Sequence, residues 1–162
     1  MHYRKEKMIE TTLCYIEKEQ RYLMLHRIRK KNDVNAGKWI GVGGKFEPGE
    51  TEEACLLREV YEETGLTLTQ YEKRGVIYFK AEGWEDEVMH LYTATQFTGE
   101  LIEDCVEGVL KWVPFEEIEA LSLWEGDRLF LKKLLQGEKD IRMTLSYNGD
   151  QLVSVKDTLE EF

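Results

Sequence analysis

Residues 44–66 read GKFEPGETEEACLLREVYEETGL, and this stretch decides how the 162-residue chain can fold. Thr51 is a favourable cap for the start of a helix, and Gly65 is a favourable residue for ending one. We therefore predict a helix over 51–64. The side chains that should face the core, because they recur at helical spacing, are Ala54, Leu57, Val60 and Tyr61.

Three carboxylates should leave one side of this helix, because Glu59, Glu62 and Glu63 are three and four residues apart. Like charges at this spacing repel one another, and a bound cation relieves the repulsion most simply. A set of oxygen ligands without histidine suits Mg²⁺, with Mn²⁺ or Ca²⁺ as alternatives, rather than zinc. Taken alone, the triplet is also compatible with an acidic helix face exposed to solvent.

The wider spacing favours the metal site. Residues 44–66 match the Nudix box, G-x5-E-x7-R-E-U-x-E-E-x-G-U with U aliphatic, at all nine fixed positions. The chain thus resembles the Nudix hydrolase superfamily. The resemblance implies an α/β (α+β) fold, an α/β/α sandwich in which helices flank a mixed β-sheet. It also implies Mg²⁺-dependent hydrolysis of a nucleoside diphosphate linked to another group, by attack of an activated water at phosphorus.

The resemblance assigns roles to the box residues. The metal ligands that it implies are the Gly43 carbonyl, Glu59, Glu62 and Glu63, while Arg58 orients the glutamates. A further glutamate before the late-strand tryptophan approaches the metals in this family, and Glu107, five residues before Trp112, is the match. The alternative for Glu107 is an acid on a surface loop. Glu63 and Glu107 are both candidates for the general base.

Outside the box, from about Thr12 to Val155, the chain is similar to MutT- and MutX-type hydrolases of oxidised purine nucleotides. This similarity rests on residues 36–45, 110–114 and 123–127 and on the terminal hairpin. It implies an 8-oxo-dGTP diphosphatase that cleans the nucleotide pool, a role in DNA repair. Trp124 would stack on the base, Asp127 would bond to the base edge, Phe79 would line the pocket and Thr12 would approach the sugar.

Each pocket residue also has a plainer interpretation. Trp124 is compatible with core packing, Asp127 with an N-cap for the following helix, and Thr12 with simple strand preference. Two positions depart from the human enzyme of the group, which has asparagine where this chain has Ile40 and a second aspartate where it has Gly126. Both departures concern recognition of the base.

A basic cluster precedes the glycine-rich stretch 41–44 and is a candidate for attracting the triphosphate. Arg27 is its strongest member because it ends a predicted strand, whereas Lys30 and Lys31 are typical of a solvated loop. Lys45, inside the box, is counted with the substrate-binding candidates.

The remaining pattern mixes strands and helices, which favours a mixed sheet with helices packed on it. Strands are predicted over 11–16, 21–26, 75–79, 89–95 and 110–114, helices over 116–121 and 127–135, and a hairpin over 143–155 with an Asn148-Gly149 turn. No domain boundary is evident, so we expect one domain over 1–162.

The acid excess is concentrated in part at the box. The chain has 22 basic and 32 acidic residues, a formal net charge of −10, and residues 44–66 contain two basic and seven acidic side chains. This balance argues against binding to nucleic acid backbones and to anionic membranes. Three cysteines without a CxxC pair suggest neither a disulfide framework nor a zinc site. With no signal peptide evident, we expect a cytoplasmic protein without an obligate protein partner.

Three functions are compared below. The first is hydrolysis of 8-oxo-dGTP to the monophosphate and pyrophosphate. The second is hydrolysis of another substrate, such as ADP-ribose, a dinucleoside polyphosphate or an unmodified NTP. The third is a non-catalytic ligand-sensing module, which the intact box disfavours.

Overall fold

A computed structural model of the chain describes residues 8–102 and 104–159. The elements in chain order are β1 (Met8–Lys18), β2 (Arg21–Arg27), β3 (Trp39–Ile40), β4 (Val42–Lys45), α1 (Glu52–Thr64), β5 (Thr67–Ala81), β6 (Asp86–Thr98), β7 (Asp104–Cys105), β8 (Gly108–Pro114), the 3₁₀ helix η1 (Phe115–Ala120), α2 (Glu125–Leu135), β9 (Ile141–Asn148) and β10 (Gln151–Lys156). All the predicted strands and the terminal hairpin are present, with longer bounds for most of them.

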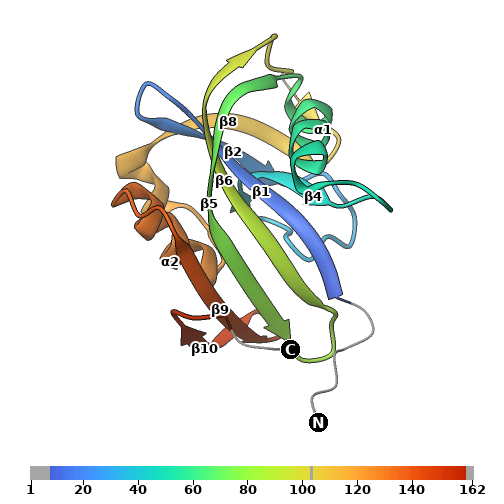
Figure 1. Cartoon of the computed structure of the whole chain (residues 1–162), viewed down its shortest axis with the longest axis vertical. Helices are drawn as coiled ribbons and strands as arrows, with labels where there is room; N and C mark the ends of the chain where they lie inside the picture. Colours follow the sequence, from blue (N-terminus) through green and yellow to red (C-terminus); the bar gives the residue numbers. More distant parts are fainter. Residues whose placement is uncertain (1–7, 103, 160–162) are drawn as a thin grey trace.

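The strands form one mixed sheet in the order β10-β9-β5-β6-β1-β2-β8-β7, with β3 beside β2 and β4 beside β1 (Figure 1). The pairs β1–β6 and β5–β9 are parallel, and the other pairs are antiparallel. The long strands β5 and β6 lie at the centre and cross the whole molecule. The predicted mixed sheet flanked by helices is therefore confirmed.

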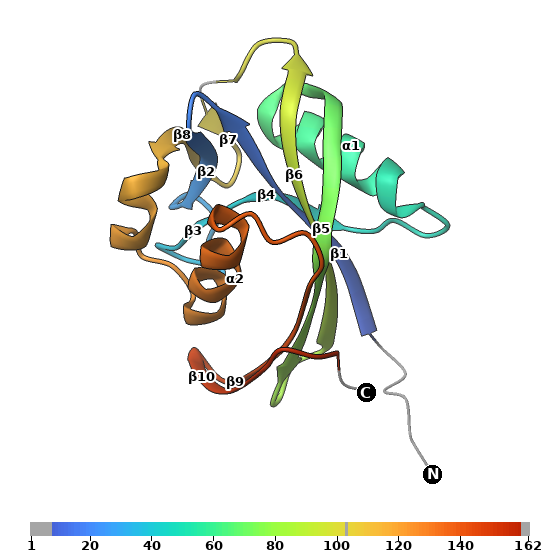
Figure 2. The same ribbon diagram turned by 60° about the vertical axis from the view of Figure 1, so that its left-hand side comes forward.

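Helices α1 and α2 cover opposite faces of the sheet, so the molecule has three layers (Figure 2). Strand β1 is apolar on both faces because helices bury both of them. Leu13 and Tyr15 join the core beneath α2, and Cys14 and Ile16 join the core beneath α1. Alternate residues of one strand thus serve two separate cores.

Helix α1 begins and ends where the sequence predicts. The Thr51 hydroxyl accepts a hydrogen bond from the Ala54 amide, and Gly65 ends the helix in the left-handed conformation. The predicted core stripe, however, was wrong at two positions, since Ala54 is exposed and Tyr61 is 59% exposed. The buried side chains are instead Cys55, Leu56, Val60, Glu63 and Thr64. The buried face is thus centred on Leu56, Val60 and Glu63, which recur at helical spacing, rather than on Ala54 and Tyr61.

The second helical region differs from the sequence prediction in kind and in start. Residues 115–120 form a 3₁₀ helix, and α2 begins at Glu125, two residues earlier than expected. Asp127 therefore lies inside the first turn of α2, and its interpretation as an N-cap is wrong. In the part of the chain that the structure describes, no helix has the length and apolar character needed to cross a membrane.

Candidate active site

Arg58, on α1, is the centre of an acidic network between the helix and the loop before it. Its guanidinium donates to both carboxylate oxygens of Glu50, at 2.7 and 2.9 Å. It also donates to Glu59 at 2.8 Å and Glu62 at 3.2 Å, and to the Lys45 carbonyl at 3.1 Å. The two-pronged contact with Arg58 lowers the pKa of Glu50 to about 2. Arg58 is thus fully engaged with protein groups and holds two of the three expected ligand carboxylates.

The glycine-rich strand β4 brings backbone against the same carboxylates. A Cβ atom on Gly44 would lie 2.4 Å from the Glu59 carboxyl carbon, so only glycine leaves room for that group. The Gly43 amide donates to Glu63 at 2.6 Å. The invariant first glycine of the box therefore has a steric purpose at this site, in addition to any role in the turn.

Glu107 reaches this cluster from the loop between β7 and β8. Burial raises the pKa of Glu63 well above its ordinary value, and the charges of Glu107 and Glu59 raise it further. Burial also raises the pKa of Glu59, with added contributions from Glu62 and Glu107. The structure therefore gathers carboxylates from α1 and from a distant loop, and their roles as metal ligands stay a prediction.

Arg27 does not take the role expected of it. Its guanidinium donates to Asp33 at 2.7 and 3.1 Å and to Glu107 at 2.6 Å. The Arg27 and Asp33 side chains are only 9% and 4% exposed. A buried guanidinium already committed to two carboxylates cannot serve as a free phosphate anchor, so the prediction of triphosphate attraction was wrong. Nothing in the sequence links residues 27, 33 and 107, whereas the fold brings them together.

A second group of site residues lies on the α2 face of the sheet. Trp124 meets Tyr147 edge to face, with ring centroids 5.6 Å apart, and Phe79 lies 6.3 Å from Tyr147. Phe79 and Trp124 are both half-buried against the α2-side core. The expected aromatic pair is thus brought together. Tyr147 is a member that the sequence prediction missed, because it had been considered only as part of a hairpin strand.

Asp127 lies beside this aromatic group and is 7% exposed. Among the described residues, none donates a hydrogen bond to its carboxyl group. Burial, together with the charge of Glu87, raises the pKa of Asp127 to about 7, and Lys38 opposes the rise. The Asp127 oxygens are not completely enclosed, because the Tyr15 hydroxyl is the only fully buried side-chain polar atom without a partner among the described residues. Acids in a largely buried setting with a raised pKa are concentrated at ligand sites.

The two departures from the human enzyme have structural explanations. A Cβ atom on Gly126 would lie 2.6 Å from both the Tyr147 hydroxyl and Leu145 Cδ1, so this site has no room for a second aspartate. The Tyr147 hydroxyl instead accepts a hydrogen bond from the Gly126 amide at 2.8 Å. Ile40 packs against the α1-side core, away from the aromatic group.

Thr12 is the second correction among the predicted substrate residues. Its side chain is buried on the α1 face, 3.6 Å from the Cys55 sulfur, and so lies on the opposite face from Trp124 and Asp127. Its neighbour Thr11 lies on the α2 face, where its hydroxyl donates to Glu87 at 2.6 Å. Alternation along β1 explains the change, since adjacent residues point to opposite faces.

Lys45 and Glu87 complete the α2 face near the box. Lys45 is exposed and pairs with Thr11 across the β1–β4 ladder. Glu87 pairs with Phe79 across the β5–β6 ladder, which puts its side chain beside that ring. Burial raises the pKa of Glu87, while Thr11 and Lys45 oppose this rise. Neither Thr11 nor Glu87 was predicted, because an isolated polar residue in a strand carries no signal.

Comparison with known families now identifies the fold and the box together. The family model of the NUDIX domain matches residues 8–134. The chain belongs to the Nudix family. This membership confirms the coarse expectation of a Nudix hydrolase that acts on pyrophosphate bonds in nucleotide substrates.

Individual relatives of this Nudix protein are similar over most of its length. An uncharacterized Nudix hydrolase, YvcI, from Bacillus subtilis is 28% identical over 143 residues, 86% of this chain and 87% of that protein. An oxidized purine nucleoside triphosphate hydrolase from Danio rerio is 38% identical over 112 residues, 68% and 70% of the two chains. The crystal structure of a MutT protein from Bacillus halodurans superposes with a TM-score of 0.82 at 28% identity, covering 91% and 96%.

Nudix hydrolases generally use a divalent cation, and the donor set here suits one. Oxygens alone are available, from Glu59, Glu62, Glu63, Glu107 and the Gly43 carbonyl, as a hard ion such as Mg²⁺ prefers. The mutual repulsion that raises the carboxylate pKa values would be relieved by a positive ion. Over residues 8–102 and 104–159, no three acidic, histidine or cysteine side chains form a ready-made ion site. Arg58 engages one oxygen of Glu59 and the Gly43 amide engages one oxygen of Glu63, which leaves the second oxygen of each carboxylate as a potential ligand.

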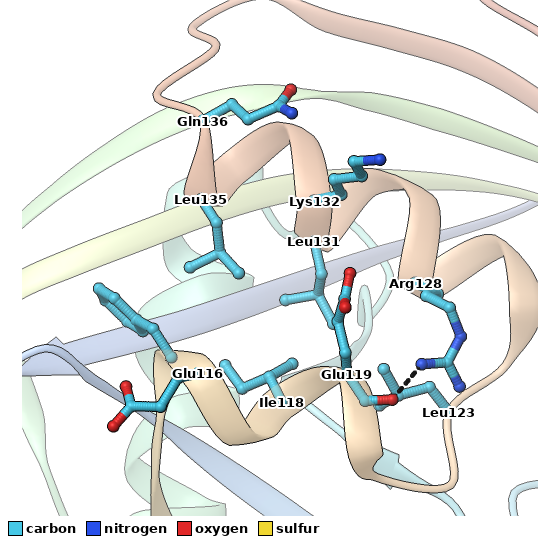
Figure 3. Close-up of a pocket in the computed structure, with 10 residues that line it drawn as sticks. Glu116, Ile118, Glu119, Leu123, Arg128, Leu131, Lys132, Leu135 and Gln136 are labelled. Atoms are coloured by element: carbon cyan, nitrogen blue, oxygen red, sulfur yellow. Dashed lines mark hydrogen bonds between the residues drawn. The ribbon is translucent and has the colours of Figure 1, made fainter.

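A separate cavity of about 270 Å³ lies between η1 and α2 (Figure 3). Its apolar part includes Ile118 and Leu131, and Arg128 at its rim donates to the Glu119 carbonyl. The residues that line it include none of the carboxylates or aromatic residues described above. This cavity is therefore distinct from the candidate active site.

Proposed function

We propose that this Nudix hydrolase is a Mg²⁺-dependent pyrophosphohydrolase of oxidised purine deoxynucleoside triphosphates, with 8-oxo-dGTP as its main substrate. The observation that carries the proposal is the largely buried Asp127, whose charge acts on Tyr147, the ring that contacts both Trp124 and Phe79. A base stacked on these rings would bring its polar edge to that carboxyl. The Danio rerio relative, an oxidized purine nucleoside triphosphate hydrolase, supports the same choice.

The chemistry of the base explains why one carboxyl can be selective. Guanine presents N7 as an acceptor, whereas 8-oxoguanine carries a hydrogen on N7 and an oxygen on C8. The ionised Asp127 carboxylate is only an acceptor, so it can pair with the N7 hydrogen of 8-oxoguanine, whereas guanine N7 offers it no donor. A site built around such a buried group rejects an analogue that leaves the group unpaired, because the desolvation cost is then not recovered.

The box residues would perform the hydrolysis. Glu59, Glu62, Glu63, Glu107 and the Gly43 carbonyl would hold the cation, with Glu62, whose side chain is 56% exposed, at the solvent edge of the group. When bound, the ion would offset the charge of the diphosphate and activate the attacking water. Glu63 and Glu107 are the two candidates that would accept a proton from the water. Arg58 would keep Glu59 and Glu62 oriented.

A nucleotide panel tests the proposal. Purified protein with Mg²⁺ should hydrolyse 8-oxo-dGTP with a kcat/KM at least about a hundredfold above that for dGTP, and release pyrophosphate rather than phosphate. Equal rates on the two nucleotides, or release of single phosphates, would refute it. A higher rate on ADP-ribose or a dinucleoside polyphosphate would establish the second function instead.

Variants separate catalysis from ligand sensing. Glu63→Gln should remain folded and lose activity by about two or more orders of magnitude, whereas Lys31→Ala, at an exposed loop position, should be unaffected. If Glu63→Gln kept full activity, the assigned roles of the box glutamates would be refuted. Within the proposed function, the biological role is removal of oxidised nucleotides before polymerases can use them.

A further inference from the structure

One continuous series of contacts joins Glu107, in the carboxylate cluster, to the aromatic group on the α2 face of the sheet. Glu107 accepts from Arg27 at 2.6 Å, and Arg27 donates through two other nitrogens to Asp33. Asp33 also accepts from the Asn35 backbone amide at 3.1 Å. The Asn35 side-chain oxygen accepts from Trp124 Nε1 at 2.8 Å. Four hydrogen-bonded steps thus connect Glu107 with Trp124.

The segment that carries these contacts is held at both ends. It leaves β2 at Arg27 and enters β3 at Trp39, and the Arg27 amide donates to the Lys38 carbonyl at 2.9 Å. The Trp39 amide donates to the Ser122 carbonyl, two residues before Trp124, also at 2.9 Å. The Arg29 amide donates to the Glu107 carbonyl at 3.2 Å. The backbone of the segment is therefore tied to both of the loops that its side chains contact.

The charged groups in this series fix the orientation of their partners more than they stabilise the fold. The Arg27 and Asp33 side chains are almost fully buried, and burying an ion pair costs desolvation that its attraction often fails to recover. The planar guanidinium fixes both partners in direction, because it binds Asp33 through a fork while a third nitrogen holds Glu107. Glu107 is 30% exposed and would otherwise be free to rotate toward solvent.

The other end orients the aromatic platform. Trp124 has a single side-chain donor, and Asn35 occupies it. Lys38 Nζ lies 5.3 Å from the Trp124 ring centroid, so a second residue of the segment contacts the ring. The ring plane on which a base would stack is therefore set by this segment as well as by Tyr147.

We propose that residues 27–38 form a positioning strap that fixes Glu107 and Trp124 relative to each other, with Asp33 and Asn35 as its positioning residues. The inference rests on the proposed function, because it concerns the same hydrolytic and base-binding groups. Asp33 acts on the hydrolytic step through Arg27 and Glu107. Asn35 acts on nucleotide binding through Trp124.

A double-mutant cycle tests the Asp33 side. Asp33→Asn keeps an acceptor for the Asn35 amide but removes the charge that holds Arg27. It should lower kcat at least about tenfold and change KM less than about threefold. In the Glu107→Gln background the same change should lower kcat by less than about twofold, because the group it positions is already disabled. An equal loss in both backgrounds would overturn the proposal.

A pair of variants tests the Asn35 side without any turnover. Asn35→Ala removes the acceptor of Trp124, whereas Asn35→Asp keeps one. The dissociation constant for 8-oxo-dGMP, measured by calorimetry, should rise about fivefold or more in Asn35→Ala and stay within about twofold in Asn35→Asp. Equal affinities in the two variants would contradict the strap. Lys31→Ala is the matched control in the same segment, and unfolding midpoints verify that each variant is folded.

The two proposals fail in different experiments. The nucleotide panel on the unmodified protein decides the proposed function, and the cycle is measured on whichever nucleotide that protein hydrolyses. The strap is judged only by comparisons between variants. If the protein prefers another substrate and the cycle is non-additive, the strap proposal stands and the substrate proposal is refuted. If the protein prefers 8-oxo-dGTP and the cycle is additive, the substrate proposal stands and the strap proposal is refuted.

Discussion

Replacing Asp127 by asparagine should change how the stability of the protein depends on pH. The substitution keeps the size of a buried side chain and removes its titration. The pKa of Asp127 is raised from 3.8 to about 7 in the folded protein, chiefly by burial. Between these values the folded state keeps a proton on Asp127 that the unfolded state releases. The contribution of the protonated Asp127 to the unfolding free energy is therefore fully present below pH 3.8 and is lost as pH rises through 7.

The size of the effect follows from the two pKa values. The whole shift corresponds to about 4 kcal/mol, and roughly 2.5 kcal/mol of it falls between pH 5 and pH 8. The unfolding free energy of Asp127→Asn minus that of the unmodified protein should therefore grow by about 2.5 kcal/mol over this interval. The charge of Glu87 contributes to the raised Asp127 pKa, and Lys38 opposes it.

Urea unfolding at pH 5, 6, 7 and 8 measures this difference directly. Carboxylates elsewhere, including Glu63, titrate in both proteins and cancel in the subtraction. Equal m-values for the two proteins would verify that the same surface is exposed on unfolding. If the difference stayed constant within about 0.5 kcal/mol across the series, Asp127 would not be the buried, shifted acid described above.

Three further predictions concern the box, the cation and the aromatic group. Gly44→Ala should lower kcat by about tenfold or more and change the unfolding free energy by less than about 1 kcal/mol, because the added methyl displaces only the Glu59 carboxylate. Kinetics and urea unfolding of the same variant test this, and a loss of stability without a loss of activity would disprove it. Chelation of divalent cations should abolish turnover, and Mg²⁺ at about a hundred times its Kd should add about 2.7 kcal/mol of stability, whereas full activity in excess chelator would refute a role for the cation. Gly126→Ala should lower the unfolding free energy by about 1 to 3 kcal/mol and reduce the preference for 8-oxo-dGTP over dGTP, because its methyl meets the Tyr147 hydroxyl. An unchanged unfolding midpoint and an unchanged preference would show that this contact is not tight.

The sequence was sufficient wherever the signal is local. The caps at Thr51 and Gly65, the turn at Asn148-Gly149 and the strands over β1 and β2 follow from residues that act on their immediate neighbours. The box itself specifies which carboxylates α1 carries, and their role in hydrolysis stays a prediction. The approach of Glu107 to these carboxylates was expected from family resemblance rather than from the spacing of residues in the sequence.

The wrong and missed predictions share a physical cause. Tertiary structure decides which face of the sheet a side chain points to and which distant residue it pairs with. Strand β1 is apolar on both sides, so its pattern does not say which threonine faces which helix, and Thr12 was chosen over Thr11. Arg27 has partners six and eighty residues away, and the sequence cannot show that they consume its charge. Tyr147 fills the place of a missing side chain at Gly126 through a contact across 21 residues.

The alternation of β1 between two cores has a consequence for how such an enzyme can diversify. Its even-numbered residues pack beneath α1, the helix that carries the box glutamates. Its odd-numbered residues pack beneath α2, on the face that would receive the base. Substitutions on one face leave the side chains of the other face untouched. New substrates can therefore be explored by changing α2, β9 and the odd positions of β1 while the bond-breaking machinery is inherited unchanged. A shift of β1 by one residue, in contrast, would exchange the two sets at once and destroy both.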